Sequence, residues 1–145
     1  MLFYWLTIFS FFIVDRLPKV YILQKSSLVS NLVESVQDDF FALYLNQNLA
    51  FSLPAPNFIL WPLLVLVLSI LLFFCYQAYQ AKQLTVWPLT LIIIGAVSNI
   101  LDRLLYGGVV DFISFWNFPV FNLSDVYISF GVVWFLYLEF KKPKS

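Results

Sequence analysis

Four aspartates lie within or beside long apolar stretches of this sequence, and they are the side chains best suited to acid–base chemistry. Asp15 lies late in the first apolar stretch, Asp102 ends the third, Asp111 follows in a short segment, and Asp125 lies near the start of the fourth. A carboxylate at membrane depth is energetically costly and usually faces a bundle interior or a water-filled cavity. Each of these aspartates is therefore a candidate functional residue.

Two sets of polar residues have helical spacing. Asn99, Asp102 and Arg103 lie at positions i, i+3 and i+4, so one helix face would carry an amide, a carboxylate and a guanidinium. Asn122 and Asp125 lie at i and i+3 on the following apolar stretch. These two are equally well explained as a helix N-cap and an acid stabilised by the helix dipole. An ion pair that holds helices together explains Asp102 and Arg103 better than catalysis does.

A turn at Gly107 and Gly108 would bring Asp111 back over the helix ends, close to Asp125. Two carboxylates in one pocket of low dielectric constant cannot both ionise cheaply, so the pair would hold a shared proton. In such a dyad the ionised acid takes a proton from water while the protonated acid polarises a carbonyl group. This arrangement predicts peptide hydrolysis that needs neither a metal nor a nucleophilic side chain.

The composition indicates a membrane protein. Of 145 residues, 62% are hydrophobic, 21% are aromatic and only 11% are charged, whereas an average soluble domain has about 25% charged residues. A soluble domain of this size could not bury so much apolar surface, so we expect the bilayer to be the solvent. Disorder, collagen and coiled-coil structure are excluded by the same composition.

Missing residue types exclude several chemistries. Histidine is absent and Cys75 is the single cysteine, which rules out a Cys/His zinc site, a Ser-His-Asp hydrolase and an internal disulfide framework. Cys75 is best explained as a small buried apolar residue. Eight basic and eight acidic residues give zero net charge, so nucleic-acid binding has little support. The sequence has no phosphate loop, metal cluster or cofactor motif, and we expect an enzyme without metal or cofactor.

Charged residues divide the chain into four apolar stretches long enough to cross a bilayer, since a spanning helix needs roughly 20 mostly apolar residues. The predicted spans are residues 2–23, 58–81, 84–104 and 120–140. A cleaved signal peptide is the alternative for the first stretch, but that stretch lacks a basic start and a small-residue cleavage site. Asp15 there is equally suited to an ion pair with Arg16 or Lys19 at the membrane interface.

Basic residues favour a cytoplasmic location for both termini. Lys82 lies between the second and third stretches, and three lysines follow the fourth within residues 141–144. The positive-inside rule places these lysines on the cytoplasmic side, so segments 25–57 and 105–119 would face outward. An equal number of basic residues on the outer side is partly offset by neighbouring acids.

The outer segment 25–57 is too long and too polar for a simple turn. Its parts 27–36 and 40–45 carry enough Val, Leu, Phe and Tyr for short strands. The predicted fold is therefore mainly α, with residues 1–145 forming one polytopic membrane domain. It would have four transmembrane helices and a small extracytoplasmic β subdomain, and we expect a monomer in contact with membrane lipid.

Five blocks of residues, in order along nearly the whole chain, resemble the lipoprotein signal peptidase (signal peptidase II) family. They are VDRLPK at 14–19, NQNLAFS at 46–52, GAVSNILDR at 95–103, VVDFI at 109–113 and FPVFNLSD at 118–125. One block alone is weak evidence, whereas five in order with these spacings are specific. The chain departs from the usual family pattern at four positions. Ser or Thr is usual at Pro18, and glycine is usual at Asn48, Ile94 and Ser98.

The resemblance implies a polytopic aspartyl endopeptidase of the bacterial cytoplasmic (inner) membrane, with its active site near the outer face. Such an enzyme removes the signal peptide from prolipoproteins, cutting before a Cys that already carries a diacylglyceryl group. By position, Asp111 and Asp125 would be the catalytic dyad. The residues that would bind substrate or support the site are Asp15, Asn46, Asn99, Asp102, Arg103 and Asn122.

Two other classes of function remain to be compared. A non-enzymatic four-helix membrane protein could use intramembrane acids to transport protons or cations, and the cost of burying these acids would be the same. A proton relay, however, needs polar groups along the whole depth of the membrane, whereas these acids cluster at one surface. A chaperone-like binder of signal peptides would keep an outer β element but would not need two acids.

Overall fold

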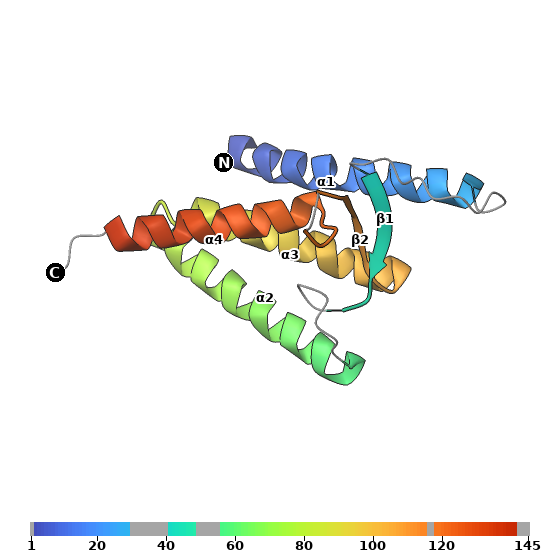
Figure 1. Ribbon diagram of the computed structural model, residues 1–145. Coiled ribbons are helices and arrows are strands. Elements are labelled where there is room, and N and C mark those ends of the chain that lie inside the picture. Colours follow the sequence, from blue (N-terminus) through green and yellow to red (C-terminus); the bar gives the residue numbers. More distant parts are fainter. Residues whose placement is uncertain (1, 30–40, 49–55, 116–117, 142–145) are drawn as a thin grey trace.

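The computed structural model describes residues 2–29, 41–48, 56–115 and 118–141 and consists of four helices and two short strands (Figure 1). In chain order the elements are α1 (Leu2–Val29), β1 (Phe41–Asn46), α2 (Asn57–Gln80), α3 (Val86–Tyr106), β2 (Val109–Ile113) and α4 (Leu123–Lys141). The start of α1 and the end of α4 lie at one end of the molecule, and the strands lie toward the other (Figure 1). The predicted mainly helical fold with a small β element is therefore confirmed in its outline.

Three of the described helices, α2, α3 and α4, are long and apolar enough to cross a membrane. The first predicted span falls within α1, but this helix carries Asp15, Arg16 and Lys19 in its middle and Pro18 inside it. It also continues to Val29, six residues beyond the predicted end at Leu23. The number of four spans accordingly stays a prediction.

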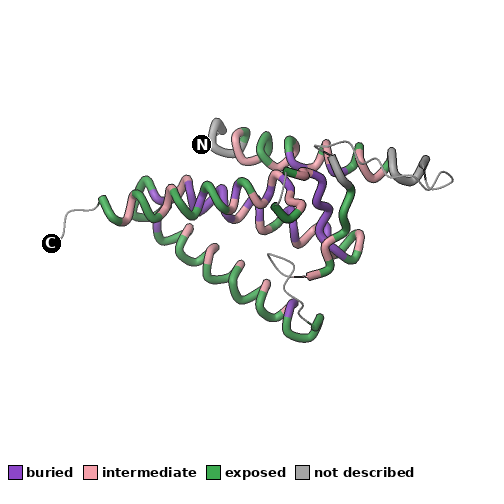
Figure 2. Tube along the Cα trace, viewed as in Figure 1, coloured by how far each residue is buried: buried purple, intermediate pink, exposed green. Residues whose placement is uncertain are grey.

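Helix α3 forms the centre of the bundle. In the most apolar 18-residue stretch of α3, 50% is buried, whereas only 6% of the corresponding stretch of α2 is buried. Figure 2 shows the buried residues concentrated along α3 and β2, while α2 is exposed over most of its length. Leu91 and Ile94 of α3 form a small core with Tyr127 of α4, so Ile94 fills apolar space between the two helices.

Two glycines allow α3 and α4 to pack closely. A Cβ added at Gly95 would lie 2.5 Å from the backbone oxygen of Ser124, and one added at Gly131 would lie 2.7 Å from Ile92 Cγ1. Real Cβ atoms essentially never show contacts under 3.0 Å. At the end of α3, Gly107 adopts a left-handed conformation with φ of 76° and its N–H bonds to the Arg103 carbonyl oxygen, which stops the helix and turns the chain toward β2.

The strands form a two-stranded antiparallel sheet in which Tyr44 pairs with Asp111 and Asn46 pairs with Val109. Its strand β1 lies at almost the place predicted for a strand at 40–45. The predicted strand at 27–36 is wrong over residues 27–29, because these continue α1, and the rest of it lies outside the described residues. The predicted loop at 105–119 is also wrong over residues 109–113, where a β-branched, buried sequence pairs with β1.

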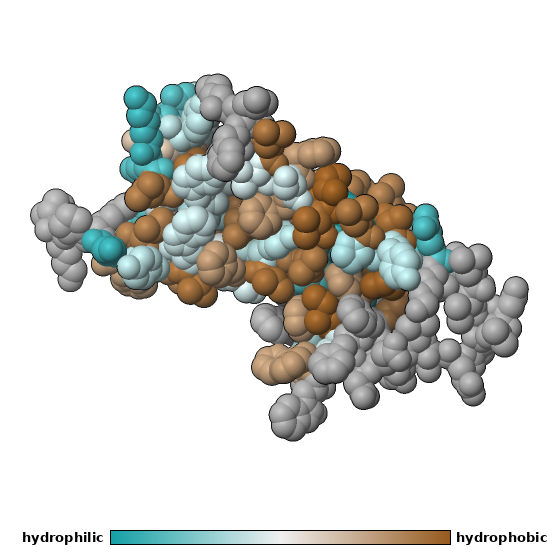
Figure 3. Space-filling view, turned by 90° about the horizontal axis from the view of Figure 1, so that it is seen from above, coloured by the Kyte–Doolittle hydropathy of each residue, from teal (hydrophilic) through white to brown (hydrophobic). Residues whose placement is uncertain are grey.

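The surface of the bundle is rich in exposed apolar side chains. On α2 alone, Phe58 is 77% exposed and Val65 is 61% exposed. Figure 3 shows hydrophobic side chains over much of the described part of one face. Apolar surface on this scale fits a lipid environment rather than water.

Candidate active site

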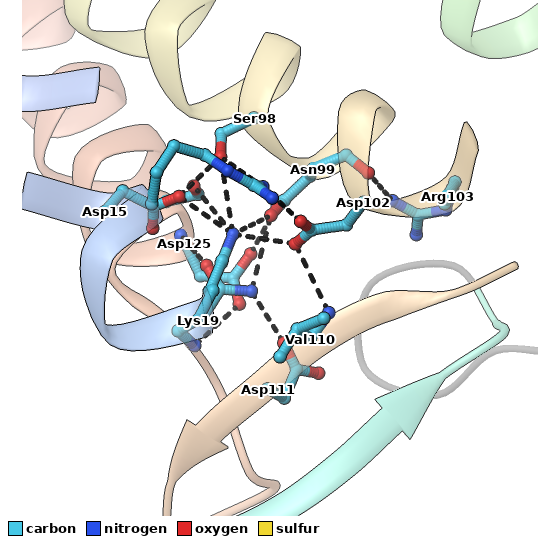
Figure 4. Close-up of polar contacts among 12 residues, drawn as sticks. Asp15, Lys19, Ser98, Asn99, Asp102, Arg103, Val110, Asp111 and Asp125 are labelled. Atoms are coloured by element: carbon cyan, nitrogen blue, oxygen red, sulfur yellow. Dashed lines mark hydrogen bonds and ion pairs between the residues drawn. The ribbon is translucent and has the colours of Figure 1, made fainter. Parts of the chain in front are cut away.

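A group of buried polar side chains lies where α1, α3, α4 and β2 meet (Figure 4). Its fully or almost fully buried members are Asp15, Lys19, Ser98, Asn99, Asp102, Asp111, Asn122 and Ser124. Burying a charge is expensive unless it is paired and hydrogen-bonded. The partners of each charge in this group therefore decide what the site can do.

Two cations from α1 neutralise two carboxylates inside the bundle. The Lys19 Nζ lies 2.9 Å from Asp15 Oδ2 and 2.8 Å from Asp102 Oδ2. Arg16 pairs with the other oxygen of Asp102, and the Ser98 hydroxyl donates to Asp15. We call these five residues the ion network. It holds α1 against α3 without leaving net charge in the interior.

Asp102 of α3 connects α1 to strand β2. The Val110 N–H donates to Asp102 Oδ2 over 3.3 Å, so the carboxylate of α3 fixes the start of β2. The next residue along β2 is Asp111, which is only 2% exposed. Asn46 Nδ2 of β1 donates to Asp111 Oδ2 over 3.2 Å, and Asn122 Nδ2 donates to Asp111 Oδ1 over 2.6 Å.

Asp125 lies in the first turn of α4 and is held by a reciprocal cap. The Asp125 N–H donates to Asn122 Oδ1 over 3.1 Å, and the Asn122 N–H donates to Asp125 Oδ2 over 3.2 Å. Asn99 Nδ2 of α3 donates to the remaining oxygen, Asp125 Oδ1, over 2.9 Å. The N-cap anticipated from the sequence thus forms, and it joins the partly buried Asp125 to Asn122, a member of the buried polar group.

Asn122 links the two carboxylates that the sequence proposed as a pair. One side-chain amide donates to Asp111 and accepts from the backbone of Asp125, and its Nδ2 also donates to Asn99 Oδ1 over 3.3 Å. The pKa of Asp111 is raised to about 6, mainly by burial and to a smaller extent by the charge of Asp125, while hydrogen bonds from Asn122 and Asn46 and the charge of Lys19 oppose the rise. A carboxyl group with this pKa can exchange a proton near neutral pH.

Arg103 does not form the anticipated ion pair with Asp102, which pairs instead with Arg16 and Lys19. Its guanidinium donates to the backbone oxygen of Asn48 over 2.9 Å and to that of Asn99 over 3.3 Å. Its Nε is buried and has no hydrogen-bond partner within the part of the chain that the structure describes. Arg103 therefore connects α3 to the residues after β1.

All eight residues predicted from the sequence lie in this region or hydrogen-bond to it. Sequence reasoning assigned no site role to Lys19, Ser98 or Ser124. Lys19 was considered only as an interface partner of Asp15, and the pair does form, but both side chains are fully buried. The i, i+4 spacing of Asp15 and Lys19 was the available signal. Among the residues that the structure describes, no cluster of three or more His, Cys, Asp or Glu could hold a metal ion.

This arrangement places two carboxylates, each held by amide donors, beside a neutralised ion network. Such a pair can activate water with its ionised member and donate a proton with its protonated member. The same constellation would be costly to maintain for packing alone, because apolar residues of similar volume are often as stabilising as buried ion pairs.

Comparison with known proteins gives a consistent result. A family model described as "Signal peptidase (SPase) II" matches residues 7–141. The chain is 34% identical to the lipoprotein signal peptidase of Burkholderia vietnamiensis, over 90% of this chain and 83% of that protein. It is 36% identical to that of Sulfurimonas denitrificans, over 96% of this chain and 88% of that protein. For Nostoc punctiforme the identity is 34%, over 98% and 92% respectively.

Two solved structures share the fold. Both are titled as bacterial membrane enzyme structures obtained by the in meso method. One has a TM-score of 0.73 at 23% identity, covering 97% of this chain and 92% of the other. The second has a TM-score of 0.68 at 22% identity, covering 96% and 92%.

Proposed function

Because the chain belongs to the signal peptidase II family, we propose that it is an aspartyl endopeptidase that removes the signal peptide from prolipoproteins. Cleavage occurs before the Cys that carries the diacylglyceryl group. The observation that carries this proposal is the Asn122 amide that joins Asp111 to Asp125, together with the raised pKa of Asp111.

In the proposed reaction the two aspartates share one proton, which belongs to the pair rather than to either residue. The ionised carboxylate takes a proton from water as the water oxygen bonds to the carbonyl carbon of the scissile peptide. The protonated carboxyl group gives its proton to the carbonyl oxygen, which forms a tetrahedral diol. The carboxyl group that gained a proton from water then protonates the peptide nitrogen, while the other carboxylate takes a proton from the diol. The C–N bond breaks, and the dyad again holds one proton.

The surrounding amides have a positioning role in this scheme. The side-chain amides of Asn122 and Asn46 donate to Asp111, and that of Asn99 donates to Asp125. Hydrogen bonds of this kind fix the carboxylates before substrate arrives, so no reorganisation is needed during reaction. The ion network contacts these amides through Lys19, whose Nζ donates to Asn99 Oδ1.

A membrane location fits this substrate. A lipidated signal peptide resides in the bilayer, and three described helices are apolar enough to lie there too. We place the dyad near the outer face of the bacterial cytoplasmic membrane, with both termini cytoplasmic. The start of α1 and the end of α4 lie at the end of the bundle away from the strands, which supports this placement (Figure 1). Substrate would then reach the dyad sideways from the bilayer.

The test is cleavage of a diacylglyceryl-modified prolipoprotein peptide by purified protein in detergent, with a chelator present. We expect wild type to cut before the lipidated Cys, and we expect Asp111→Asn and Asp125→Asn each to abolish cleavage. Glu139→Gln near the far end of α4 is the matched control for loss of a carboxylate. Full cleavage by either aspartate variant would refute the dyad, whereas absence of cleavage by folded wild type would favour a protein that binds signal peptides without cutting them.

A further inference from the structure

Lys19 is the most connected side chain of the site, although it lies on α1 and not on the elements that carry the dyad (Figure 4). Its side chain is fully buried. Besides its two carboxylate partners, its Nζ donates to Asn99 Oδ1 over 3.4 Å, to Ser124 Oγ over 3.3 Å and to Ser98 Oγ over 3.5 Å. One cation thus contacts its own helix, α3 and α4.

The contact between Lys19 and Asn99 determines the orientation of the Asn99 side-chain amide. An asparagine side chain has an accepting oxygen and a donating nitrogen of similar size, and its neighbours determine the orientation. Lys19 and Asn122 both donate to Asn99 Oδ1. The Asn99 nitrogen must then point at Asp125 Oδ1, where it donates over 2.9 Å. A reversed amide would place its oxygen against the carboxylate and its nitrogen against a cation.

The contact with Asp102 leads to the other acid. Lys19 and the Val110 N–H share the same carboxylate oxygen of Asp102, Oδ2. Without Lys19, this oxygen would lose one of these two donors. The Asp102 carboxylate would then be held less rigidly, and so would the hydrogen bond that joins α3 to β2. Because Val110 precedes Asp111, the position of the dyad depends on this contact as well.

We propose that Lys19 is a positioning residue for peptide hydrolysis, which orients Asn99 toward Asp125 and, through Asp102, fixes the strand that carries Asp111. The inference rests on the proposed function. An ordinary structural salt bridge would only hold helices together, whereas Lys19 fixes the positions of both acids.

The electrostatic environment of Lys19 makes a second consequence testable. The charged groups around Lys19 and the two acids are Asp15 and Arg16 on α1, Asp102 and Arg103 on α3, Asp111 on β2 and Asp125 on α4. The positive charge of Lys19 lowers the pKa of Asp111, against the larger effect of burial. Removal of this charge should therefore move the pH profile of kcat toward higher pH.

The experiment compares Asp15→Asn with the double variant Asp15→Asn, Lys19→Met. Lys19→Met alone would leave an unpaired buried carboxylate and could unfold the protein, whereas the double variant removes one charge of each sign. Arg16→Gln is a further control, because Arg16 also pairs with Asp102 but has no hydrogen bond to Asn99 among the described contacts. Thermal unfolding in detergent establishes that each variant is folded, and kcat, KM and the pH profile of kcat are then measured with the lipidated peptide.

We expect the double variant to have a kcat about 100-fold below that of Asp15→Asn, the size of loss that a misplaced catalytic group produces. Its KM should change little and its profile should move to higher pH. Arg16→Gln should lower the unfolding temperature without moving the profile. Equal kcat and equal profiles for the double variant and Asp15→Asn would overturn the role of Lys19. A profile moved equally by Arg16→Gln would also overturn it. If Asp111→Asn still cleaves in the same assay, the proposed function itself fails.

Discussion

The close approach of α3 and α4 at Gly95 gives a quantitative prediction for Gly95→Ala. The added methyl would lie 2.5 Å from the Ser124 carbonyl oxygen and 2.8 Å from Ile128 Cγ1. The backbone oxygen cannot rotate away, so the helices must separate by roughly 0.5 Å to restore a 3.0 Å contact. Overpacking of this kind typically costs about 1–3 kcal/mol of unfolding free energy.

The same separation acts directly on the site, because Ser124 precedes Asp125. The bond from Asn99 Nδ2 to Asp125 Oδ1 is 2.9 Å long, and a shift of roughly 0.5 Å takes it beyond the usual range of about 2.7–3.2 Å for such bonds. We therefore expect kcat to fall by about 100-fold, in addition to the loss of stability. KM should change less, because the methyl group would lie in the contact between α3 and α4.

The assay is thermal unfolding in detergent combined with kcat and KM for the lipidated peptide. Gly131→Ala is the matched control, because its methyl would lie 2.7 Å from Ile92 Cγ1 and 3.0 Å from the Pro88 backbone oxygen in the same interface, away from Asn99. We expect a similar drop in unfolding temperature for Gly131→Ala and a much smaller drop in kcat. Wild-type kcat in Gly95→Ala, or equal loss of kcat in both variants, would refute the coupling between packing and catalysis.

Further predictions concern the carboxylates. The pKa of Asp111 is about 6 in the folded protein, above the 3.8 of an ordinary Asp, so its ionisation destabilises the fold as pH rises through this window. Asp111→Asn should thus unfold at a higher temperature than wild type at pH 8, with the difference shrinking toward pH 4. Asn46→Leu removes a hydrogen bond that lowers the pKa of Asp111, and the acid limb of the kcat profile should move to higher pH. Ser98→Ala leaves Asp15 without its hydroxyl donor and should cost about 1–3 kcal/mol. Ser69→Ala is its control in thermal unfolding, because that exposed hydroxyl donates only to the backbone of its own helix.

The sequence predicted the positions of α2, α3 and α4 to within a few residues, because uninterrupted apolar stretches are the strongest signal in a membrane protein. It also predicted Asp15, Asp102, Asp111 and Asp125 as candidate site residues, since a carboxylate beside such a stretch has few inexpensive roles, and the fold brings these four into one region. The turn at Gly107 was readable from residue type alone, as glycine suits the left-handed conformation seen there.

What the sequence could not supply depends on partners far away in the chain. Lys19 reads as an interface residue until Asp102, 83 positions later, is brought against it. Strand β2 reads as a loop because its apolar run is short, and it becomes a strand only by pairing with β1. Helix α1 continues to Val29, beyond the end predicted at Leu23, and Pro18 lies inside it.

The charge pairs also have an order in time. Chains are made from the N-terminus, so Asp15 is followed by its partner Lys19 one helical turn away on the same helix. Asp102 is made only after Arg16 and Lys19 are already in place to receive it. During biosynthesis Asp15 is therefore followed within one helical turn by its cation, and Asp102 is preceded by both of its cations. The growing chain can deliver an acidic site to the bilayer without passing through a stage in which one of these acids has to be accommodated alone.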